Sequence, residues 1–238
     1  MIAKQLFEAG RVTEAIQALG AHLRDHPTDA ASRTFLFELL CFAGEYDRAE
    51  KQLGVLAQSG QQAELGAVLY YSALHGERTR LEMFQKQAFP SPGADMQIPG
   101  SINGKPFQSI RDADADIGPR LEMFAAGSYM WLPFAHIASL QMEQPKRLRD
   151  TLWAPAAITT GPEFKGTELR EVLIPVIYPF SSKHPEQAVW LGRMTAWGED
   201  DQGVQYPSGQ KVFLVDGEEV PLLEVQSIEF QHGEAAAN

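Results

Sequence analysis

Alternating carboxylates at Asp112, Asp114 and Asp116 are the residues of this chain whose type and spacing most resemble a cation site. Oxygen ligands at every second position are what a calcium-binding EF-hand loop presents. A loop starting at Asp112 would also need glycine at its sixth place and glutamate at its twelfth, where this chain has Ile117 and Met123. We therefore predict an acidic turn whose side chains accept hydrogen bonds from nearby backbone amides.

His22 and His26 are a second candidate for metal chemistry. They are four residues apart and would share one face of a helix. The sequence places no third ligand beside them, and the other histidines are scattered along the chain. We predict a solvated or partly packed pair of histidines at this position.

The chain contains no motif typical of an enzyme: it lacks G-x-S-x-G, the P-loop and G-x-G-x-x-G. The run Ser181-Ser182-Lys183-His184 has suitable residue types, but no known mechanism uses that spacing, and a surface turn is the better interpretation. Cys41 lies in an apolar helical stretch, where we expect a buried and inert thiol. The sequence therefore predicts a protein that is not an enzyme and has no catalytic, cofactor-binding or metal-binding residues.

Tryptophan supplies the alternative hypothesis. All four tryptophans fall in the second part of the chain: Trp131, Trp153, Trp190 and Trp197. Together with Asp112 and Asp114 they would line a small-molecule pocket, which would make the second part an enzyme or a sensor. Tryptophans more often fill the core of a β-domain. Both interpretations stay open at this point.

Composition excludes several classes of function. The 238 residues carry a formal net charge of -11, whereas general nucleic-acid binding requires clustered Lys and Arg. No apolar run approaches the roughly 20 residues that span a bilayer, and the N-terminus has charges where a secretion signal has an apolar region. Cys41 is the single cysteine, so an internal disulfide is excluded. We expect a cytoplasmic protein.

The first 89 residues differ from the rest in composition. Only Pro27 of the 15 prolines lies there, and proline breaks helices. Residues 1–89 carry 9 basic and 11 acidic side chains, and residues 90–238 carry 11 and 20. The sequence thus predicts an α+β protein, with a helical domain at 1–89 and a β-rich domain at 90–238. A basic partner surface would preferentially meet the more acidic second domain.

An internal repeat organises the first domain. Gly10-Arg11-Val12-Thr13-Glu14-Ala15 aligns with Gly44-Glu45-Tyr46-Asp47-Arg48-Ala49 at an offset of 34 residues, the period of the tetratricopeptide repeat, which has two antiparallel helices per unit. Each glycine stands where one helix must end, and each alanine is small where two helices would approach closely. A weaker third copy begins at Gly76. We expect helices at 2–9, 13–24, 31–43, 47–58, 63–75 and 78–88.

In tetratricopeptide arrays the first helix of each unit lines a concave groove that binds peptides or helices of partner proteins. Carried over by position, the predicted groove consists of Lys4, Phe7, Glu8, Thr34, Glu38, Cys41, Phe42 and Tyr70. Fewer than three full repeats rarely bury enough surface to stand alone, so the second domain should pack against the end of the array. The alternative is therefore that the predicted groove residues pack against the second domain.

The second domain is predicted to be rich in strands. Alternating or apolar runs indicate six to eight strands, among them 105–110, 120–124, 129–132, 172–178, 211–215 and 220–225. Asp216-Gly217 predicts a tight hairpin turn between the last two. Short helices are expected near 137–150 and 185–191.

Several blocks of the second domain together resemble one known family. They include Gly104-Lys105-Pro106-Phe107, Gly127-Ser128-Tyr129-Met130-Trp131-Leu132-Pro133, Leu148-Arg149-Asp150-Thr151-Leu152-Trp153-Ala154-Pro155-Ala156, Pro175-Val176-Ile177-Tyr178-Pro179 and Leu191-Gly192-Arg193-Met194-Thr195-Ala196-Trp197. In order and spacing they resemble the ImpE family, also called SciE or TagJ, accessory proteins of the bacterial type VI secretion system. The resemblance extends over nearly the whole chain. Ala196 departs from it, because an acidic residue is expected before that tryptophan.

The resemblance implies a role in protein contacts. Members of the family are associated with the contractile sheath, through a helix of its small TssB-type subunit, and with the ClpV-type AAA+ ATPase that recycles contracted sheath. The implied function is that of an adaptor between sheath and ATPase. The resemblance implies no interface residues, so the predicted groove rests on the geometry of tetratricopeptide repeats alone.

Overall fold

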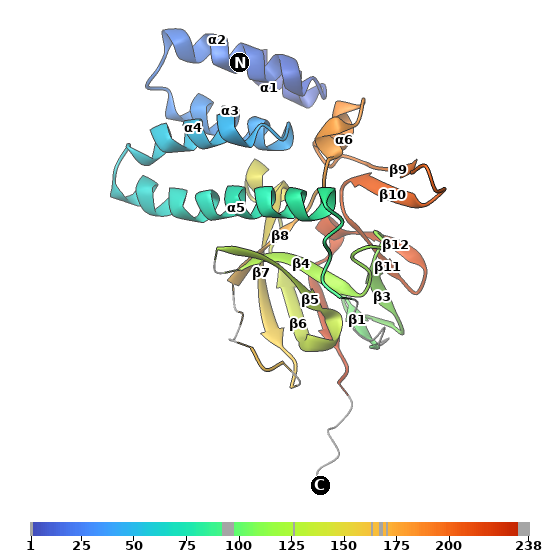
Figure 1. The fold of residues 1–238 in the computed structure, drawn as a ribbon. Helices are drawn as coiled ribbons and strands as arrows, with labels where there is room; N and C mark the ends of the chain where they lie inside the picture. The colour runs from blue at the N-terminus through green and yellow to red at the C-terminus, as the bar shows by residue number, and fades with distance from the viewer. Residues whose placement is uncertain are drawn as a thin grey trace.

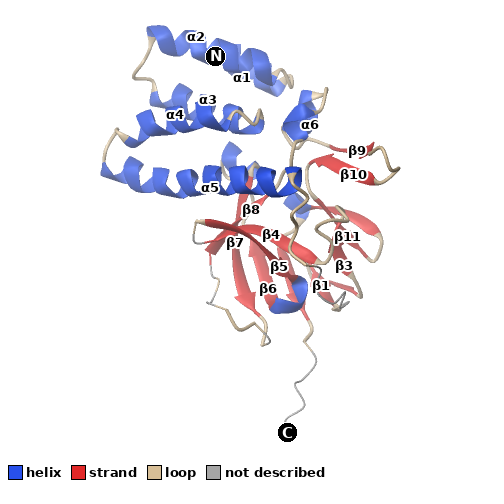
Figure 2. Cartoon of the chain, viewed as in Figure 1, coloured by secondary structure: helices blue, strands red, loops and turns tan. Residues whose placement is uncertain are grey.

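The computed structural model describes residues 2–91, 98–125, 127–162, 164–166, 169 and 171–232. Helices form the first part of the chain and strands dominate the second (Figures 1 and 2), which confirms the predicted α+β fold. The long helices end at Gln85, and the first strand begins at Gly100. The domain boundary near residue 90 stays a prediction, and residues 92–97, which follow it, lie outside the described residues.

Two antiparallel helix pairs form the repeat. They are α1 (Ile2–Glu8) with α2 (Val12–Asp25) and α3 (Ala30–Phe42) with α4 (Tyr46–Ala57). Gly10 and Gly44 adopt φ angles of 75° and 71° in the turns within the pairs, a conformation that would strain most other residues. Ala15 and Ala49 have no exposed surface. The first two copies of the repeat are therefore confirmed.

The prediction of a third copy of the repeat is wrong. A single helix of 25 residues, α5 (Gln61–Gln85), runs through the positions where two helices were expected. Gly76 lies inside it and packs against Phe124 of the second part, where a Cβ atom would lie 2.4 Å from Cδ1 of the ring. This glycine allows close approach between a helix and a sheet, and it does not end a helix.

The described residues of the second part form three antiparallel sheets. The largest has the strand order β2-β1-β13-β6-β7-β8-β4-β5. Its strands are β1 (Gly100–Ile102), β2 (Lys105–Phe107), β4 (Arg120–Ala125), β5 (Ser128–Pro133), β6 (Ile137–Met142), β7 (Trp153–Thr160), β8 (Glu171–Pro175) and β13 (Ser227–Phe230). A second sheet joins β3 (Ile110–Asp112), β11 (Val212–Val215) and β12 (Glu218–Pro221), and a third pairs β9 (Thr195–Glu199) with β10 (Gln205–Gly209).

The described residues thus form 13 strands, more than the six to eight expected. Several of them contain only three or four residues, which is too few to show an alternating pattern. The predicted turn at Asp216-Gly217 is confirmed: both residues have positive φ, 51° and 88°, and they join β11 to β12.

The helix expected at 137–150 is wrong, because Ile137–Met142 form β6 and only Leu148–Thr151 make a turn of 3₁₀ helix. A register shift between Ile137 and Ser139 interrupts the alternation of β6. Its buried residues Ile137, Leu140 and Met142 are consequently spaced three and two apart, so the strict alternation that identifies a strand is missing. The helix expected at 185–191 is confirmed in shorter form as α6 (Gln187–Trp190).

The helical core continues into the second part. Its cluster of buried side chains extends from the repeat to Phe124, Trp153, Leu173 and Leu191. In Figure 1, α5 lies between the α3–α4 pair and the sheet. The second part therefore packs against the end of the array, as predicted. No helix in the part of the chain that the structure describes is long and apolar enough to cross a membrane.

Candidate functional site

The first-repeat part of the predicted groove remains accessible. Lys4 and Glu8 are exposed on α1, with their charged groups 3.8 Å apart. Phe7 is half-buried, with the ring centre of Phe35 at 5.5 Å and the guanidinium of Arg193, from the second part, at 4.9 Å from its ring centre. Thr34, which belongs to the second repeat, is half-buried on α3. A partner would therefore find only the outer end of the groove open.

The other second-repeat residues of the groove lie against the second part of the chain. Glu38, Cys41 and Phe42 are 7%, 2% and 3% exposed. Glu38 pairs at 3.2 Å with Arg149, whose guanidinium lies 4.9 Å from the ring centre of Tyr70. Burial raises the pKa of the Glu38 carboxyl and of the Cys41 thiol. These positions agree with the alternative prediction, in which the groove residues pack against the second domain.

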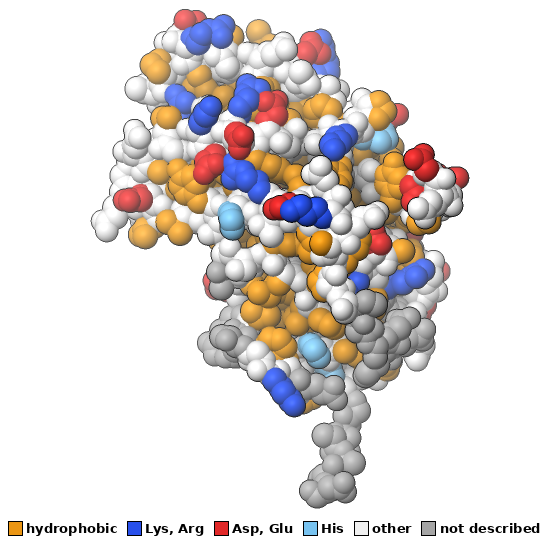
Figure 3. All heavy atoms as spheres, in the orientation of Figure 1, with side chains coloured by type: hydrophobic (Ala, Val, Ile, Leu, Met, Phe, Trp, Pro, Cys, Tyr) orange, Lys and Arg blue, Asp and Glu red, His pale blue; other side chains and the backbone are white. Residues whose placement is uncertain are grey.

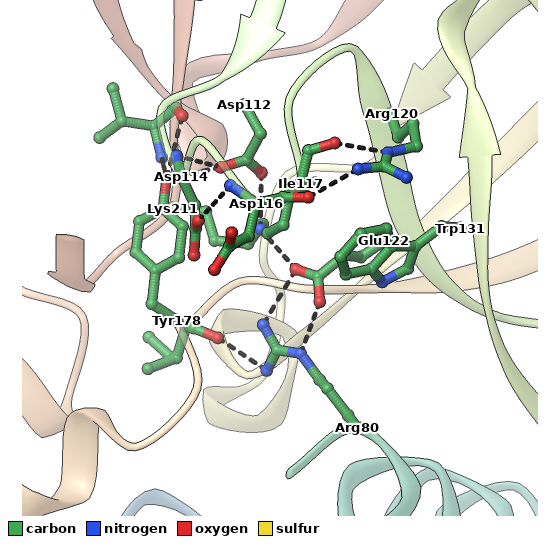
Figure 4. A network of polar contacts seen from close by, with 12 residues as sticks. Arg80, Asp112, Asp114, Asp116, Ile117, Arg120, Glu122, Trp131, Tyr178 and Lys211 are labelled. Carbon is green, nitrogen blue, oxygen red and sulfur yellow. Dashed lines mark hydrogen bonds and ion pairs between the residues drawn. The ribbon is translucent and has the colours of Figure 1, made fainter. Parts of the chain in front are cut away.

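A network of buried charges joins α5 to the strands (Figure 4). Arg80 of α5 donates to both carboxylate oxygens of Glu122 on β4, at 2.8 and 3.0 Å, and pairs with Glu77 at 3.3 Å. Lys211 bonds the same Glu122 carboxylate at 2.5 Å and that of Asp112 on β3 at 2.6 Å. None of these five residues is more than 6% exposed.

Aromatic side chains donate further hydrogen bonds to these carboxylates. The Trp153 indole donates to Glu77 at 2.9 Å, the Tyr178 hydroxyl to Asp112 at 2.9 Å and the Tyr129 hydroxyl to Glu122 at 2.5 Å. Pairing is what makes buried charges tolerable, since removing one partner leaves the other desolvated and uncompensated.

The ionic state of the network follows from its pairing. Burial opposes ionisation of Glu122, but the charges of Arg80 and Lys211 outweigh it and hold its pKa at about 2. Burial also opposes the charge of Lys211, and Asp112 and Glu122 raise its pKa nonetheless. The network is therefore an ionic connection that fixes α5 on the sheet.

Sequence reasoning missed Arg80, Glu122 and Lys211. Glu122 stands in the alternating run Leu121-Glu122-Met123 as if it faced solvent. Every residue of β4 is buried, however, because β4 is an inner strand of the sheet and α5 packs on it. A carboxylate with large apolar residues on both sides within one strand is the signal that would have indicated a buried partner.

The acidic turn is confirmed. The Asp112 carboxylate accepts from the Asp114 amide, and the Asp114 carboxylate from the Asp116 amide, each at 2.9 Å. Within the described ranges, no group of three or more His, Cys, Asp and Glu could hold a metal ion. His22 and His26 stack with ring centres 4.3 Å apart.

The surface turn predicted at 181–184 is only partly right. Residues Ser181–Lys183 form a turn of 3₁₀ helix, but Ser181 is buried at 2% exposure. Its hydroxyl donates to the Tyr178 carbonyl and accepts from the Gly209 amide, both at 2.7 Å. The serine hydroxyl is thus used to hold two loops together.

The tryptophans and aspartates of the alternative hypothesis do not share a pocket. Trp153 lines a cleft beside α5, whereas Asp112 and Asp114 are not among its lining residues. Trp153 is buried, but Trp197 is 42% exposed on β9. The geometry gives no support to a combined Trp–Asp site.

The cleft beside α5, called the α5 cleft below, has a volume of about 580 Å³ and lies between the first half of α5 and strands β4, β6, β7 and β8. Its apolar lining includes Leu69, Tyr70, Phe124, Trp153, Pro155 and Ala156. Glu143, Asp150 and Glu171 add carboxylates to the lining. Tyr70 is the one member of the predicted groove that lines this cleft.

Exposed apolar side chains continue from the α5 cleft along the helix. Leu65, Val68 and Leu69 are 67%, 58% and 49% exposed, and their spacing puts them on one face of α5. Hydrophobic side chains appear near the start of α5 in Figure 3. An exposed apolar stripe that leads into an apolar cleft is typical of a surface that binds another protein.

Comparisons with known proteins agree with this architecture. Residues 104–229 match the family model described as ImpE protein, and residues 6–69 match a tetratricopeptide repeat model. A relative from Pseudomonas aeruginosa, named type VI secretion system accessory component TagJ, is 31% identical over 272 aligned positions, covering 99% of this chain and 93% of the relative. The crystal structure of a Vibrio parahaemolyticus protein has the same fold, with a TM-score of 0.87, 21% identity and full coverage of both chains.

Proposed function

The chain belongs to the ImpE family, and from this premise we propose that it is a non-enzymatic accessory protein of a type VI secretion system. The full-length similarity to TagJ supports this role. The tetratricopeptide repeat supports a function in binding other proteins. In the finer form of the proposal, the protein acts in the cytoplasm as an adaptor, binding a helix of the small TssB-type sheath subunit and linking contracted sheath to the ClpV-type ATPase.

The observation that carries the binding proposal is the α5 cleft with its exposed stripe. A partner helix that buries an apolar face recognises an apolar groove through side chains at i, i+3, i+4 and i+7. Leu65, Val68 and Leu69 offer such contacts outside the cleft, and Trp153 and Pro155 offer them inside it. Lys4, Phe7, Glu8 and Thr34, at the open end of the predicted groove, are the second candidate for this contact.

Titration calorimetry of the purified chain with the purified TssB-type subunit tests the proposal. Leu69→Asp places a charge at the mouth of the α5 cleft, and we expect it to weaken binding at least about tenfold, or about 1.4 kcal/mol. Val55→Asp is the matched control, because Val55 is 44% exposed on α4 and does not line the cleft.

Lys4→Glu tests the open end of the predicted groove in the same titration. Weaker binding in Lys4→Glu with unchanged binding in Leu69→Asp would move the contact to the predicted groove. If the unmodified chain does not bind the sheath subunit, the adaptor role is rejected. Retention of the ClpV-type ATPase on immobilised sheath, with and without this protein, then tests the linking step.

A further inference from the structure

The hairpin of β9 and β10 exposes apolar side chains that the proposed contacts do not use. Met194 and Trp197 are each 42% exposed, Tyr206 is 47% exposed and Val204 is 51% exposed. The hairpin is a separate two-stranded sheet. Tyr206 covers Gly198 across the strand pair, where a Cβ atom would lie 2.6 Å from the ring. Exposed aromatic residues of this kind are enriched where proteins bind one another.

Strand β9 also has an open edge. Trp197 lies opposite Pro207, which has no N–H to donate, so this is a non-hydrogen-bonded pair and the N–H and C=O of Trp197 point away from β10. By alternation, the same groups of Thr195 and Glu199 face outward. No third strand among the described residues pairs with β9. Natural edge strands often carry lysine or proline to prevent pairing, and Thr195–Glu199 contains neither.

The charge of the hairpin selects the kind of partner. Between Arg193 and Lys211 the sequence has no basic residue, but it has Glu199, Asp200 and Asp201 at the tip. Figure 3 shows acidic side chains beside hydrophobic ones at this position. These carboxylates repel nucleic-acid phosphates and anionic lipids, and they attract lysine and arginine.

We propose that β9 docks an extended, basic segment of a partner protein, which adds to the hairpin as a third strand. Backbone hydrogen bonds to the free edge supply affinity, and alternate side chains supply specificity. On one face the segment meets Trp197, and on the other it meets the small residues Ala196 and Gly198 beside Tyr206. The alanine at 196, where the family resemblance leads one to expect an acid, keeps that face apolar.

The docking site deepens the proposed adaptor function, on which it rests, by supplying a second surface separate from the α5 cleft. Two separate surfaces are what a protein needs to hold two partners at once. The acidic tip would also hasten encounter with a basic segment, and binding should weaken as salt is added.

Selection of a phage-displayed library of short random peptides against the full chain tests the proposal. We expect enrichment of peptides that combine Lys or Arg with apolar residues. Synthetic copies of the enriched peptides should bind at least about tenfold more weakly to Trp197→Ala. Binding should fall further in Trp197→Pro, which also removes the outward-facing N–H, and in the double variant Glu199→Lys/Asp201→Lys.

Leu69→Asp serves as the control and should bind these peptides unchanged, so failure at the α5 cleft and failure at the hairpin are distinguishable. Melting temperatures of all variants check that the fold is retained. The proposal is overturned if no peptide is enriched, if the enriched peptides lack basic residues, or if the Trp197 variants bind as the unmodified chain does. Tight binding to phosphatidylglycerol vesicles, or dimerisation of this chain through β9, would also overturn it.

Discussion

Folding favours the protonated form of the Asp114 carboxyl group. Burial raises its pKa to about 6, the positive charge of Lys211 opposes this, and the negative charge of Asp112 adds to it. An acid with a raised pKa binds its proton more tightly when folded, so the free energy of unfolding falls as pH rises from about 4 to 6. At pH 7 the ionised Asp114 therefore costs stability.

Asp114→Asn removes this cost and keeps the hydrogen bond to the Asp116 amide. We expect the variant to be more stable at pH 7 by about 2–3 kcal/mol, and equally stable below about pH 3, where Asp114 is neutral in both the folded and the unfolded chain. Urea unfolding at a series of pH values measures the difference. Asp116→Asn, in the same turn but exposed, is the control, and the same gain there would contradict the explanation.

For individual residues, the sequence predicted those contacts that form between neighbours along the chain. The acidic turn is local, since Asp112 accepts from the amide of Asp114. The ion pair of Asp112 with Lys211 depends on β3 meeting β11, and nothing near either residue specifies that pairing. The Arg80–Glu122 pair was unpredictable for the same reason.

Among the elements, α5 shows how a glycine can mislead. In most helices Gly→Ala is stabilising, by about 1 kcal/mol. Gly76→Ala should do the opposite and destabilise the protein by about 1–3 kcal/mol, because the new methyl group would lie 2.4 Å from the Phe124 ring. Denaturant unfolding of the variant measures the change.

Gly66→Ala is the matched control in the same helix, because no atom lies within 4 Å of a Cβ atom built there. It should stabilise the protein by about 0.5–1 kcal/mol. Phe124→Leu should recover part of the loss in a double variant with Gly76→Ala. If both glycine variants stabilise the protein equally, close packing of α5 on β4 is not the reason for Gly76.

Helix periodicity and the 34-residue offset were sufficient to predict helices α1 to α4, because each helix pair has its own turn glycine and small contact residue. The rule that a repeated glycine marks a turn between helices failed at Gly76, because contact with the sheet, not a turn, requires that glycine. In β6 the register shift between Ile137 and Ser139 concealed a strand. The α5 stripe of Leu65, Val68 and Leu69 could not be recognised as exposed, since periodicity does not reveal which face a neighbour covers.

Over the whole molecule, the second part occupies much of the surface that a longer array would offer to partners. Glu38 and Tyr70 contact Arg149, and Trp153 donates to Glu77. The groove inferred from repeat geometry is therefore partly filled by the chain itself. The α5 cleft, at the border of the two parts, is the apolar surface that this arrangement leaves open.

A core shared between the two parts predicts that they unfold together. All four tryptophans lie beyond residue 90, whereas the long helices lie within residues 2–85. Tryptophan fluorescence therefore reports on the second part, and far-ultraviolet circular dichroism mainly on the first. We expect the two signals to change at the same urea concentration, because Phe124, Trp153 and Leu173 belong to the same core as the helices.

Arg80→Met tests whether the charge network contributes to this coupling. Removing the guanidinium leaves Glu122 with Lys211 and Tyr129 as its partners among the described residues, and we expect the free energy of unfolding to fall by about 3–5 kcal/mol. Both spectroscopic transitions should move to lower urea together. A helical transition that separates from the fluorescence transition already in the unmodified chain would show two independent units, and the α5 cleft would then be a contact between them rather than part of one folded body.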